Sequence, residues 1–451
     1  MIKILATIGP SSDAKPIIEG FSGHDVLFRL NGSHGNLAWH QQAIKNIRTQ
    51  VEEAFILLDV PGVKPRTANE QALDIKKGQH VFFGGGAAVK DMLHVQLTRP
   101  LPMIDPSEKC FSVNDGQYVF DILDSGEQFL IGQSRVDFTL LSRKGLNVPN
   151  SIYDEKKQLR IYEEFITQVV DLDIDGLGLS FVQTGELVEK VRSLLPKAVL
   201  VSKIENTEGL KNCEKIIEKS DAIMIDRGDL AAEIGLTGLY DAVLEISAFT
   251  KGAGKPLIMA TENLESMMTR EVPSKSEVMS IAHSVEIGAD CIMLSEETAV
   301  AKNGLMIVSW LAEYLEKLTP PARVHHVPSE RKKYPEIWQL VKYLGECPVL
   351  LMSKSGYALF DFIAAKPEGE ITVVTNNLKV KAITKLFSRN ICVLPAEAKQ
   401  NTPIETIWEV VAKNKVTLFG PHDKIAALFV SKYVRESRAN CITFFHKNDF
   451  T

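Results

Sequence analysis

The stretch VSKIENTEGLKNCEKIIEKSDAIMIDRGDLAAEIG, residues 201–235, decides the fold. Two short apolar runs, at 199–201 and 222–225, are typical of buried parallel strands, and the charged segment between them has helical spacing. Lys203 and Glu205 follow the first run, and Asp229 follows the second. Ligands of α/β folds bind at this edge, because strand ends face an open rim and the next helices offer unpaired N–H groups to anions. The stretch therefore predicts a ligand site at a sheet rim.

Two interpretations of these charges remain open. Most loop charges are simply solvated, and spacing alone does not separate such charges from a site. The chemistry of the residues favours a site, since Glu205 and Asp229 can share one hard divalent cation. Gly228 lets the backbone approach a phosphate or carboxylate. An ammonium group beside two carboxylates, as at Lys203, is typical of functional sites.

Length and composition describe an ordinary globular protein of several domains. A chain of 451 residues exceeds the usual size of one domain, and its 45% hydrophobic and 24% charged residues suffice for several cores. The formal net charge of -6 is spread along the chain, which argues against a nucleic-acid-binding surface. We therefore expect small-molecule partners rather than nucleic acid.

The cysteines and the apolar runs bear on the compartment. The six cysteines are far apart and form no CxxC pair, which predicts reduced, mostly buried thiols rather than a disulfide framework or a zinc site. The N-terminal MIKILATIGP has too short an apolar run for a signal peptide, and no run reaches the roughly 18 apolar residues of a membrane span. We expect a cytoplasmic protein with no membrane partner.

Strands and helices alternate along most of the chain. A helix is expected at 37–53, and strands are expected at 2–7, 26–30, 55–59, 176–179, 199–201, 222–225, 257–260 and 291–294. Eight such βα units predict a TIM (β/α)8 barrel, in which right-handed crossovers place every strand's carboxyl end on one face. Polar residues at these ends are Arg29, Asn31, Asp59, Ser180, Lys203, Glu205, Asp229, Thr261, Ser295 and Glu297. Their recurrence at the strand ends supports one common site.

Two further segments depart from this alternation. Residues 65–150 are rich in glycine, valine and short turns, including GGGAA at 84–88, and predict a small β domain inserted in the barrel. After Leu318, TPPARVHHVPSERKKYP predicts a linker in which His325 and His326 are solvated. Strands at 348–352, 371–375 and 391–394 predict a smaller doubly wound domain. We expect barrel segments at 1–64 and 151–318, the insertion at 65–150, and a C-terminal α/β domain at 319–451.

Several segments together resemble the signatures of pyruvate kinases. KIENTEG at 203–209 and IDRGDLAAE at 225–233 are similar to the family's KIENxEG and xxARGDLGxE. Further similar segments are ATIGPSS, FRLNGSHG, LLDVPGVKPRT, FSVNDG, KGLNVP, GLGLSFVQ, MATENLESMM and MLSEETA. The resemblance covers nearly the whole barrel and is weaker elsewhere, so we expect a divergent member. It implies transfer of the phosphoryl group of phosphoenolpyruvate to ADP, giving pyruvate and ATP in glycolysis, and a homotetramer.

The resemblance also implies roles for individual residues. Glu205 and Asp229 would hold Mg²⁺ or Mn²⁺. Arg29 and Lys203 would neutralise the moving phosphoryl group and the enolate oxygen, as transfer of a charged group requires. Thr261, Ser295 and Glu297 would order the proton relay to carbon. Substrate would also contact Ser180, Gly228 and Asp229, and the nucleotide and cation sites would include Asn31, Ser33, His34, Asp59, Lys64, Arg66 and Lys144.

Plainer roles are open for some of these residues. Ser180, Thr261 and Ser295 each follow a strand, where a hydroxyl most often caps a helix. His34 could be a neutral surface histidine.

Several positions depart from the family pattern. Lys64 stands where K⁺-dependent members carry Glu, so the resemblance implies that K⁺ is not required. Asp226, Glu262 and Glu296 add carboxylates near the expected phosphate, where like-charge repulsion weakens anion binding unless they are paired or turned away. Gln183 replaces the family's Arg. These departures put turnover or the identity of the substrate in question.

The C-terminal segment departs further. SKSGYA at 353–358 resembles the family's effector loop, although an ordinary strand-to-helix turn fits it as well. The final RESRANCITFFHKNDFT lacks the closing effector motif, so we expect sugar-phosphate activation to be absent or different. Three functions stay open: a working pyruvate kinase, an enzyme acting on a related enol phosphate or keto acid, or a non-catalytic metabolite-binding relative. The retained lysine, carboxylates and hydroxyls favour an enzyme.

Overall fold

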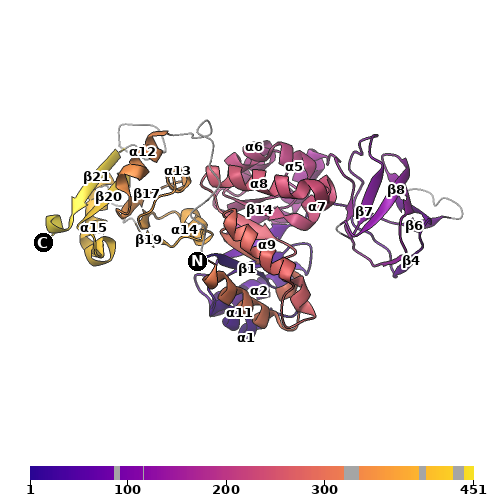
Figure 1. Cartoon of the computed structure of the whole chain (residues 1–451), viewed down its shortest axis with the longest axis horizontal. Coiled ribbons are helices and arrows are strands. Elements are labelled where there is room, and N and C mark those ends of the chain that lie inside the picture. Colours follow the sequence, from indigo (N-terminus) through magenta and orange to yellow (C-terminus); the bar gives the residue numbers. More distant parts are fainter. Residues whose placement is uncertain (86–91, 115, 319–334, 396–402, 430–440, 451) are drawn as a thin grey trace.

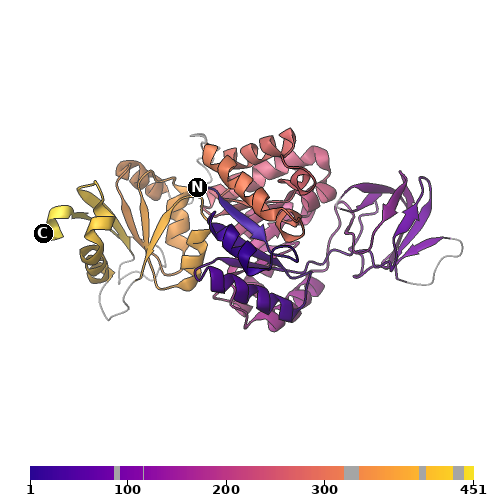
Figure 2. The same ribbon diagram turned by 90° about the horizontal axis from the view of Figure 1, so that it is seen from below.

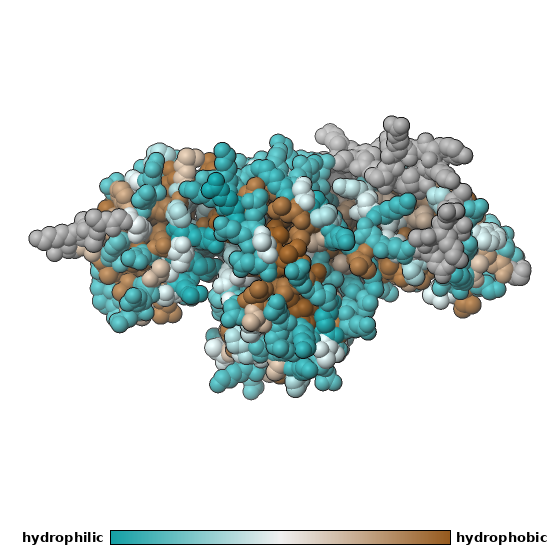
Figure 3. Space-filling model, turned by 180° about the vertical axis from the view of Figure 1, so that it is seen from behind, coloured by the Kyte–Doolittle hydropathy of each residue, from teal (hydrophilic) through white to brown (hydrophobic). Residues whose placement is uncertain are grey.

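The computed structural model describes residues 1–85, 92–114, 116–318, 335–395, 403–429 and 441–450. Its three parts lie in a row, with the barrel in the middle, the inserted strands at one end and the C-terminal part at the other (Figures 1 and 2). On the face drawn in Figure 3, hydrophilic residues cover most of the surface and hydrophobic residues gather over the middle of the molecule. Among the described residues, no helix has the length and apolar character needed to cross a membrane.

Eight parallel strands close the central barrel, in the order β1-β16-β15-β14-β13-β12-β3-β2. The strands are β1 (Lys3–Thr7), β2 (Val26–Asn31), β3 (Ile56–Val60), β12 (Gly176–Leu179), β13 (Val199–Ile204), β14 (Ala222–Asp226), β15 (Leu257–Ala260) and β16 (Cys291–Leu294). The predicted TIM barrel is therefore confirmed.

Helices surround the barrel and bury the outward side chains of its strands. They are α1 (Lys15–Ser22), α2 (Leu37–Gln50), α3 (Glu155–Val169), α4 (Gly185–Leu194), α5 (Thr207–Lys211), α6 (Cys213–Lys219), α7 (Arg227–Ile234), α8 (Leu236–Gly252), α9 (Lys275–Glu286), α10 (Glu296–Ala299) and α11 (Gly304–Lys317). Outward residues such as Ile4, Phe28 and Leu58 share one apolar core with these helices.

A charged layer covers the carboxyl end of the barrel interior. Side chains alternate between the two faces of a strand, so residues two apart point the same way. The inward apolar residues include Leu5, Leu27, Leu57, Val201 and Met224. Two residues further along the same strands stand Thr7, Arg29, Asp59, Lys203 and Asp226. The inner stack of the barrel thus ends in polar and charged side chains, all of them buried.

Several element boundaries differ from the sequence prediction, most of them by one residue. Strand β13 runs to Ile204 rather than to 201, so Lys203 lies inside the strand instead of after it. The prediction ended the strand where the apolar run ended, but an inward polar side chain does not interrupt the backbone ladder. Helix α2 ends at Gln50 rather than at 53. The single helix expected after β13 is two, α5 and α6, which meet at Asn212.

The segment between β3 and α3 forms the predicted small β structure. Its strands are β4 (Leu73–Ile75), β5 (His80–Gly84), β6 (Leu93–Val95), β7 (Cys110–Val113), β8 (Tyr118–Ser125), β9 (Phe129–Ser134), β10 (Phe138–Leu140) and β11 (Leu146–Asn147). Six of them form the sheet β11-β7-β8-β9-β5-β6, and β10 pairs with β4. Phe83, Phe111 and Phe120 pack against one another in its core. Most of GGGAA lies outside the described residues.

The C-terminal part has a larger sheet than the sequence predicted. Its order is β19-β18-β17-β20-β21, and only the β20–β21 pair is antiparallel. The elements are α12 (Pro335–Leu344), β17 (Val349–Met352), α13 (Tyr357–Ala364), β18 (Ile371–Val374), α14 (Leu378–Lys385), β19 (Ile391–Leu394), α15 (Pro403–Phe419), β20 (Lys424–Phe429) and β21 (Cys441–His446). The prediction missed β20 and β21. The expected linker, with His325 and His326, lies outside the described residues, and the domain limits stay a prediction.

The C-terminal part closes the amino end of the barrel. Inward barrel residues such as Leu5 and Val199 share one apolar cluster with Phe362 and Phe387. Ion pairs at the rim join Lys379 to Asp221 at 3.0 Å and Lys381 to Glu53 at 2.8 Å. The opposite, carboxyl end of the strands faces the inserted β part (Figure 1).

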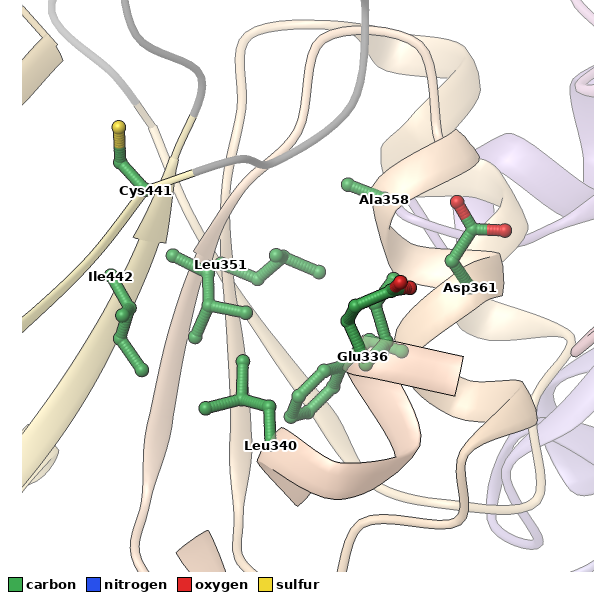
Figure 4. A pocket seen from close by; sticks show the side chains of 10 residues that line it. Glu336, Leu340, Leu351, Ala358, Asp361, Cys441 and Ile442 are labelled. Atoms are coloured by element: carbon green, nitrogen blue, oxygen red, sulfur yellow. The ribbon is translucent and has the colours of Figure 1, made fainter. Parts of the chain in front are cut away.

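The C-terminal part also contains a pocket between α12, α13 and its sheet (Figure 4). Its lining is mostly apolar, for example Leu340, Leu351 and Phe362, with Glu336 and Asp361 as its carboxylates. None of the predicted site residues lines it.

All six cysteines are free in the structure. Three of them, Cys213, Cys291 and Cys347, are buried, whereas Cys392 is exposed.

Candidate active site

Lys203 is the centre of the charged layer. It is 5% exposed, and its Nζ lies 2.6 Å from Glu205, 3.4 Å from Asp226 and 3.5 Å from Asp59. Burial alone would lower the pKa of Lys203, but Glu205, Asp59 and Asp226 outweigh it and raise this pKa well above its ordinary value. The ammonium group is therefore charged in the folded protein.

Arg29 and Asp59 form a second buried pair beside this lysine. Arg29 Nε and Nη2 donate to Asp59 Oδ2 at 3.0 and 2.8 Å, and Nη1 donates to Thr7 Oγ1 at 2.9 Å. Burial opposes ionisation of Asp59, yet Arg29 and Lys203 lower its pKa overall. This carboxylate therefore fixes both cations at the mouth of the barrel.

Gly178 on β12 leaves the room that Asp59 occupies. A Cβ at Gly178 would lie 1.9 Å from Asp59 Oδ1 and 2.8 Å from its Cγ, closer than atoms pack. The pairing of Gly178 with Asp59 in the β12–β3 ladder places the two residues side by side. Glycine at this position is thus part of the site.

Three carboxylates converge beside Lys203. Single oxygens of Glu205, Asp226 and Asp229 all lie within 4.8 Å of one another. Glu205 Oε2 accepts a hydrogen bond from Phe181 N at 2.6 Å. Burial, together with Asp226 and Asp229, raises the pKa of Glu205 to about 8, against the opposing effect of Lys203. A cluster of carboxylate oxygens suits a hard divalent cation.

Lys64 forms an ion pair with Asp229. It is 4% exposed and lies in the segment that leaves β3 for the inserted part. A fixed ammonium group therefore contacts one of the predicted metal ligands.

Thr261 lies in a strained turn that Arg227 holds. Thr261 and Glu262 have φ values of 61° and 52°, in the left-handed region, which costs residues other than glycine about 1–3 kcal/mol each. Arg227 donates to the carbonyl of Thr261, to that of Glu262 at 3.3 Å and to Asn263 Oδ1 at 2.8 Å. Thr261 Oγ1 accepts from Gly228 N at 3.0 Å and lies 3.2 Å from Asp226 Oδ1.

Ser180 and Ser295 do not cap the helices that follow them. Ser180 Oγ donates to the carbonyl of Val60 at 2.9 Å, and α4 is capped by Thr184 instead. Ser295 stands at the N-cap of α10 without a side-chain cap bond, and its Oγ lies 3.5 Å from Arg29 Nη1. The structure thus gives these hydroxyls contacts other than the helix caps that were the plainer interpretation.

Glu297 connects two loops of the site. Its carboxylate accepts from Leu264 N at 3.2 Å and from Ser295 N at 2.6 Å. Burial raises its pKa. These bonds hold the loops that carry Thr261 and Ser295.

The predicted nucleotide-side residues lie at the junction with the inserted part. Asn31 Oδ1 accepts from Ser33 N at 3.0 Å, and Arg66 Nη1 donates to Arg143 O at 3.1 Å. Lys144 N donates to Thr67 Oγ1 at 3.0 Å. Partial burial, followed by Arg66 and Arg143, lowers the pKa of His34, which is therefore neutral at neutral pH.

The departures from the family pattern have different surroundings. Glu262 and Glu296 are exposed. Gln183 is buried and exchanges hydrogen bonds with the backbone of Tyr153 at 2.9 and 3.0 Å. Asp226, by contrast, lies in the cluster and is paired with Lys203. The expected repulsion is therefore offset at Asp226, the one extra carboxylate that is buried.

Comparisons with known proteins agree with this geometry. The family described as "Pyruvate kinase, barrel domain" matches residues 1–306, which include every residue of the charged layer. The chain belongs to the pyruvate kinase family. It is therefore a kinase of the transferase class, and the predicted resemblance is confirmed.

Several relatives are named pyruvate kinases. The cytosolic isozyme of Nicotiana tabacum is 32% identical over 330 residues, 69% of this chain and 65% of that protein. The Agrobacterium vitis enzyme is 29% identical over 85% of this chain and 84% of its own length. The Thermotoga maritima enzyme is 31% identical over 69% of each chain. Identities this modest agree with a divergent member of the pyruvate kinase family.

The residues present fit the divalent cation that this family uses. Glu205 and Asp229 supply carboxylate oxygens, the ligands that Mg²⁺ and Mn²⁺ prefer. Glu205 Oε1 is buried without a well-directed hydrogen bond, although Lys203 Nζ lies 2.6 Å away.

Sequence reasoning about pyruvate kinase signatures missed two kinds of residue. Gly178 lies within an expected strand and Arg227 within a quoted motif, and the sequence indicates neither the space that Gly178 leaves for Asp59 nor the hydrogen bonds of Arg227 to the Thr261 turn. Glu233, which accepts from Asn147 Nδ2 at 3.0 Å, links α7 to the inserted part. Such contacts join residues far apart in sequence, so no local pattern indicates them.

Proposed function

We propose that this protein transfers the phosphoryl group of phosphoenolpyruvate to ADP, giving pyruvate and ATP in cytoplasmic glycolysis. The observation that carries the proposal is the buried Lys203, surrounded by carboxylates and adjacent to the Arg29–Asp59 pair at the open end of the barrel. In the transfer, the bond between phosphorus and the enol oxygen breaks, a bond to the terminal oxygen of ADP forms, and the enolate gains a proton on carbon.

The charged side chains divide the work of stabilising this transfer. Glu205 and Asp229 would hold Mg²⁺ or Mn²⁺, which would supply positive charge to the substrate's carboxylate and phosphoryl oxygens. Arg29 would face the phosphoryl group, since Asp59 fixes its guanidinium. Lys203 would face the enolate oxygen. Charges that the fold holds in place need no reorganisation as the reaction proceeds, which is the main source of electrostatic catalysis.

The hydroxyls would deliver the proton. Thr261 and Ser295 lie at neighbouring strand ends beside Asp226 and Arg29. Glu297 would act as a positioning residue, because its carboxylate binds the backbone of both loops. Ser180, Gly228 and Asp229 would complete the substrate site.

The nucleotide would bind toward the inserted part. The residues proposed to contact it are Asn31, Ser33, His34, Arg66 and Lys144, together with Asp59 on β3. Arg66 and Arg143 supply positive charge there, as their effect on the pKa of His34 indicates. This charge suits the phosphates of ADP.

A coupled assay tests the proposal. Purified protein is mixed with phosphoenolpyruvate, ADP and Mg²⁺, and pyruvate is reduced by lactate dehydrogenase as NADH absorbance is followed. We expect NADH consumption that needs all three components and stops on chelation with EDTA. No NADH consumption with Mg²⁺ or with Mn²⁺ would rule out the proposed reaction.

We expect this turnover not to require K⁺. The Lys64 ammonium, paired with Asp229, supplies the fixed positive charge that a monovalent ion would otherwise bring. In Na⁺-free tetramethylammonium buffer, the rates with and without KCl should agree within about twofold. The Lys64 ammonium group is part of the protein, so it keeps its place when K⁺ is removed from the buffer. Lys64→Glu is the matched variant and should need KCl. A strict K⁺ requirement of the wild-type protein would contradict the assignment.

Two further expectations rest on comparison with the family, one on a resemblance to it and one on a departure from it. We propose a homotetramer, which size-exclusion chromatography with light scattering would test. Sugar-phosphate activation is expected to be absent or different, and a large increase in rate with fructose bisphosphate would contradict this expectation.

A further inference from the structure

Asp226 occupies a position from which its side chain would ordinarily cap a helix. It is the last residue of β14 and the N-cap of α7, where an aspartate usually accepts a hydrogen bond from the first turn. Its side chain makes no such bond. Instead Oδ2 lies 3.4 Å from Lys203 Nζ and Oδ1 lies 3.2 Å from Thr261 Oγ1. The carboxylate is therefore directed into the charged cluster.

The cluster has the ligand atoms and the charge of a cation site with three carboxylates. Oxygens of Glu205, Asp226 and Asp229 lie within 4.8 Å of one another. For comparison, opposite ligands of one bound Mg²⁺ lie about 4.2 Å apart, twice its usual bond length, so small movements of these side chains would bring all three oxygens to one cation. Two ammonium groups, Lys203 and Lys64, contact these three carboxylates. Glu205 Oε1 is buried inside this cluster and lies 2.6 Å from Lys203 Nζ.

We propose that Asp226 is a third carboxylate ligand of the divalent cation, beside Glu205 and Asp229. The inference rests on the metal site of the proposed function and goes beyond the two ligands that the family resemblance implies. A third carboxylate adds both a ligand oxygen and a negative charge, so the protein binds the cation firmly before any substrate is present. The alternative is that Asp226 serves only as a counter-ion of Lys203 and a partner of Thr261.

Mn²⁺ binding in the absence of substrate separates these roles. The electron paramagnetic resonance signal of free Mn²⁺ is titrated with wild-type protein, Asp226→Asn, Asp226→Ala and Asp226→Glu. We expect the asparagine and alanine variants to raise the Mn²⁺ Kd at least about tenfold, because each removes a charged ligand, and the glutamate variant to bind more tightly than either. A Kd of Asp226→Asn within about twofold of wild type would overturn the proposal, since loss of even a residue that only supports a metal ligand typically costs about 10–100-fold in affinity.

Two controls complete the titration. Glu262→Gln removes an exposed carboxylate of the neighbouring loop and should leave the Mn²⁺ Kd unchanged, whereas Glu205→Gln should weaken binding. Thermal unfolding of each variant shows whether it is folded, and the glutamate variant keeps the test decisive where alanine destabilises the protein. Because no phosphoenolpyruvate or ADP is present, the two claims can fail separately. Mn²⁺ binding that depends on Asp226 in a protein that forms no pyruvate would reject the proposed reaction alone.

Discussion

Lys203→Met is expected to lower kcat for pyruvate formation by about 10³-fold or more, the size of effect seen when one preorganised charge is removed from a transferring phosphoryl group. Methionine keeps most of the length of the side chain but carries no charge. The enolate oxygen would then form beside Asp59, Glu205 and Asp226 without the ammonium group that now contacts all three. The coupled assay at saturating substrate measures the loss.

The variant also tests stability, because Lys203 is 5% exposed. Removing one partner of a buried ion pair costs about 3–5 kcal/mol, since it leaves a charge unpaired. Thermal unfolding therefore has to accompany the assay. Lys211→Met is the matched control, because Lys211 on α5 has a side chain 64% exposed and should change neither kcat nor unfolding. A folded Lys203→Met protein with kcat within tenfold of wild type would refute the role of this lysine.

Gly178→Ala is expected to lower kcat by about 10²-fold or more, because even a 1 Å displacement of a positioning group can have this effect. The new methyl group would lie 1.9 Å from Asp59 Oδ1, so Asp59 has to move. Arg29 and Lys203 would then lose the carboxylate that fixes them. The coupled assay gives kcat, and a crystal structure of the variant would show the displacement of Asp59.

The cost in stability should be modest beside the loss of activity. Overpacking a buried site typically costs about 1–3 kcal/mol, which a domain of this size can tolerate. Gly238→Ala on α8 is the matched control, because its nearest new contact is Ile234 at an ordinary 3.9 Å. A wild-type kcat in Gly178→Ala, with Asp59 in its original position, would contradict the role of Gly178 in positioning Asp59.

The alternation of strands and helices was enough to predict the barrel. Each short apolar run is buried on both faces, so strands such as β12, β15 and β16 have the predicted limits. Lys203 was expected after the strand because the apolar run ends at Val201, whereas β13 continues to Ile204. The inward positions two residues beyond the apolar layer would have located the charged cluster more reliably.

The sequence could not predict which residues from different strands the fold would bring into contact at the site. The sequence predicted that Asp226 would repel the substrate phosphate. Only the fold places it against Lys203 and near Glu205 and Asp229. Gly178 and Arg227 act on partners in other strands, so their sequence neighbours carry no trace of the contact. In the C-terminal part, β20 and β21 complete a sheet whose other strands were predicted.

The most direct test follows the phosphorus atom itself. Phosphorus-31 NMR of the protein with phosphoenolpyruvate, ADP and Mg²⁺ shows where the transferred group goes. The proposed reaction predicts that the phosphoenolpyruvate resonance decays as the γ-phosphate of ATP grows in equal amount, and that both changes are slower by about 10³-fold or more in Lys203→Met. Decay into inorganic phosphate, or an unchanged phosphoenolpyruvate resonance with folded, Mn²⁺-binding protein, would contradict it.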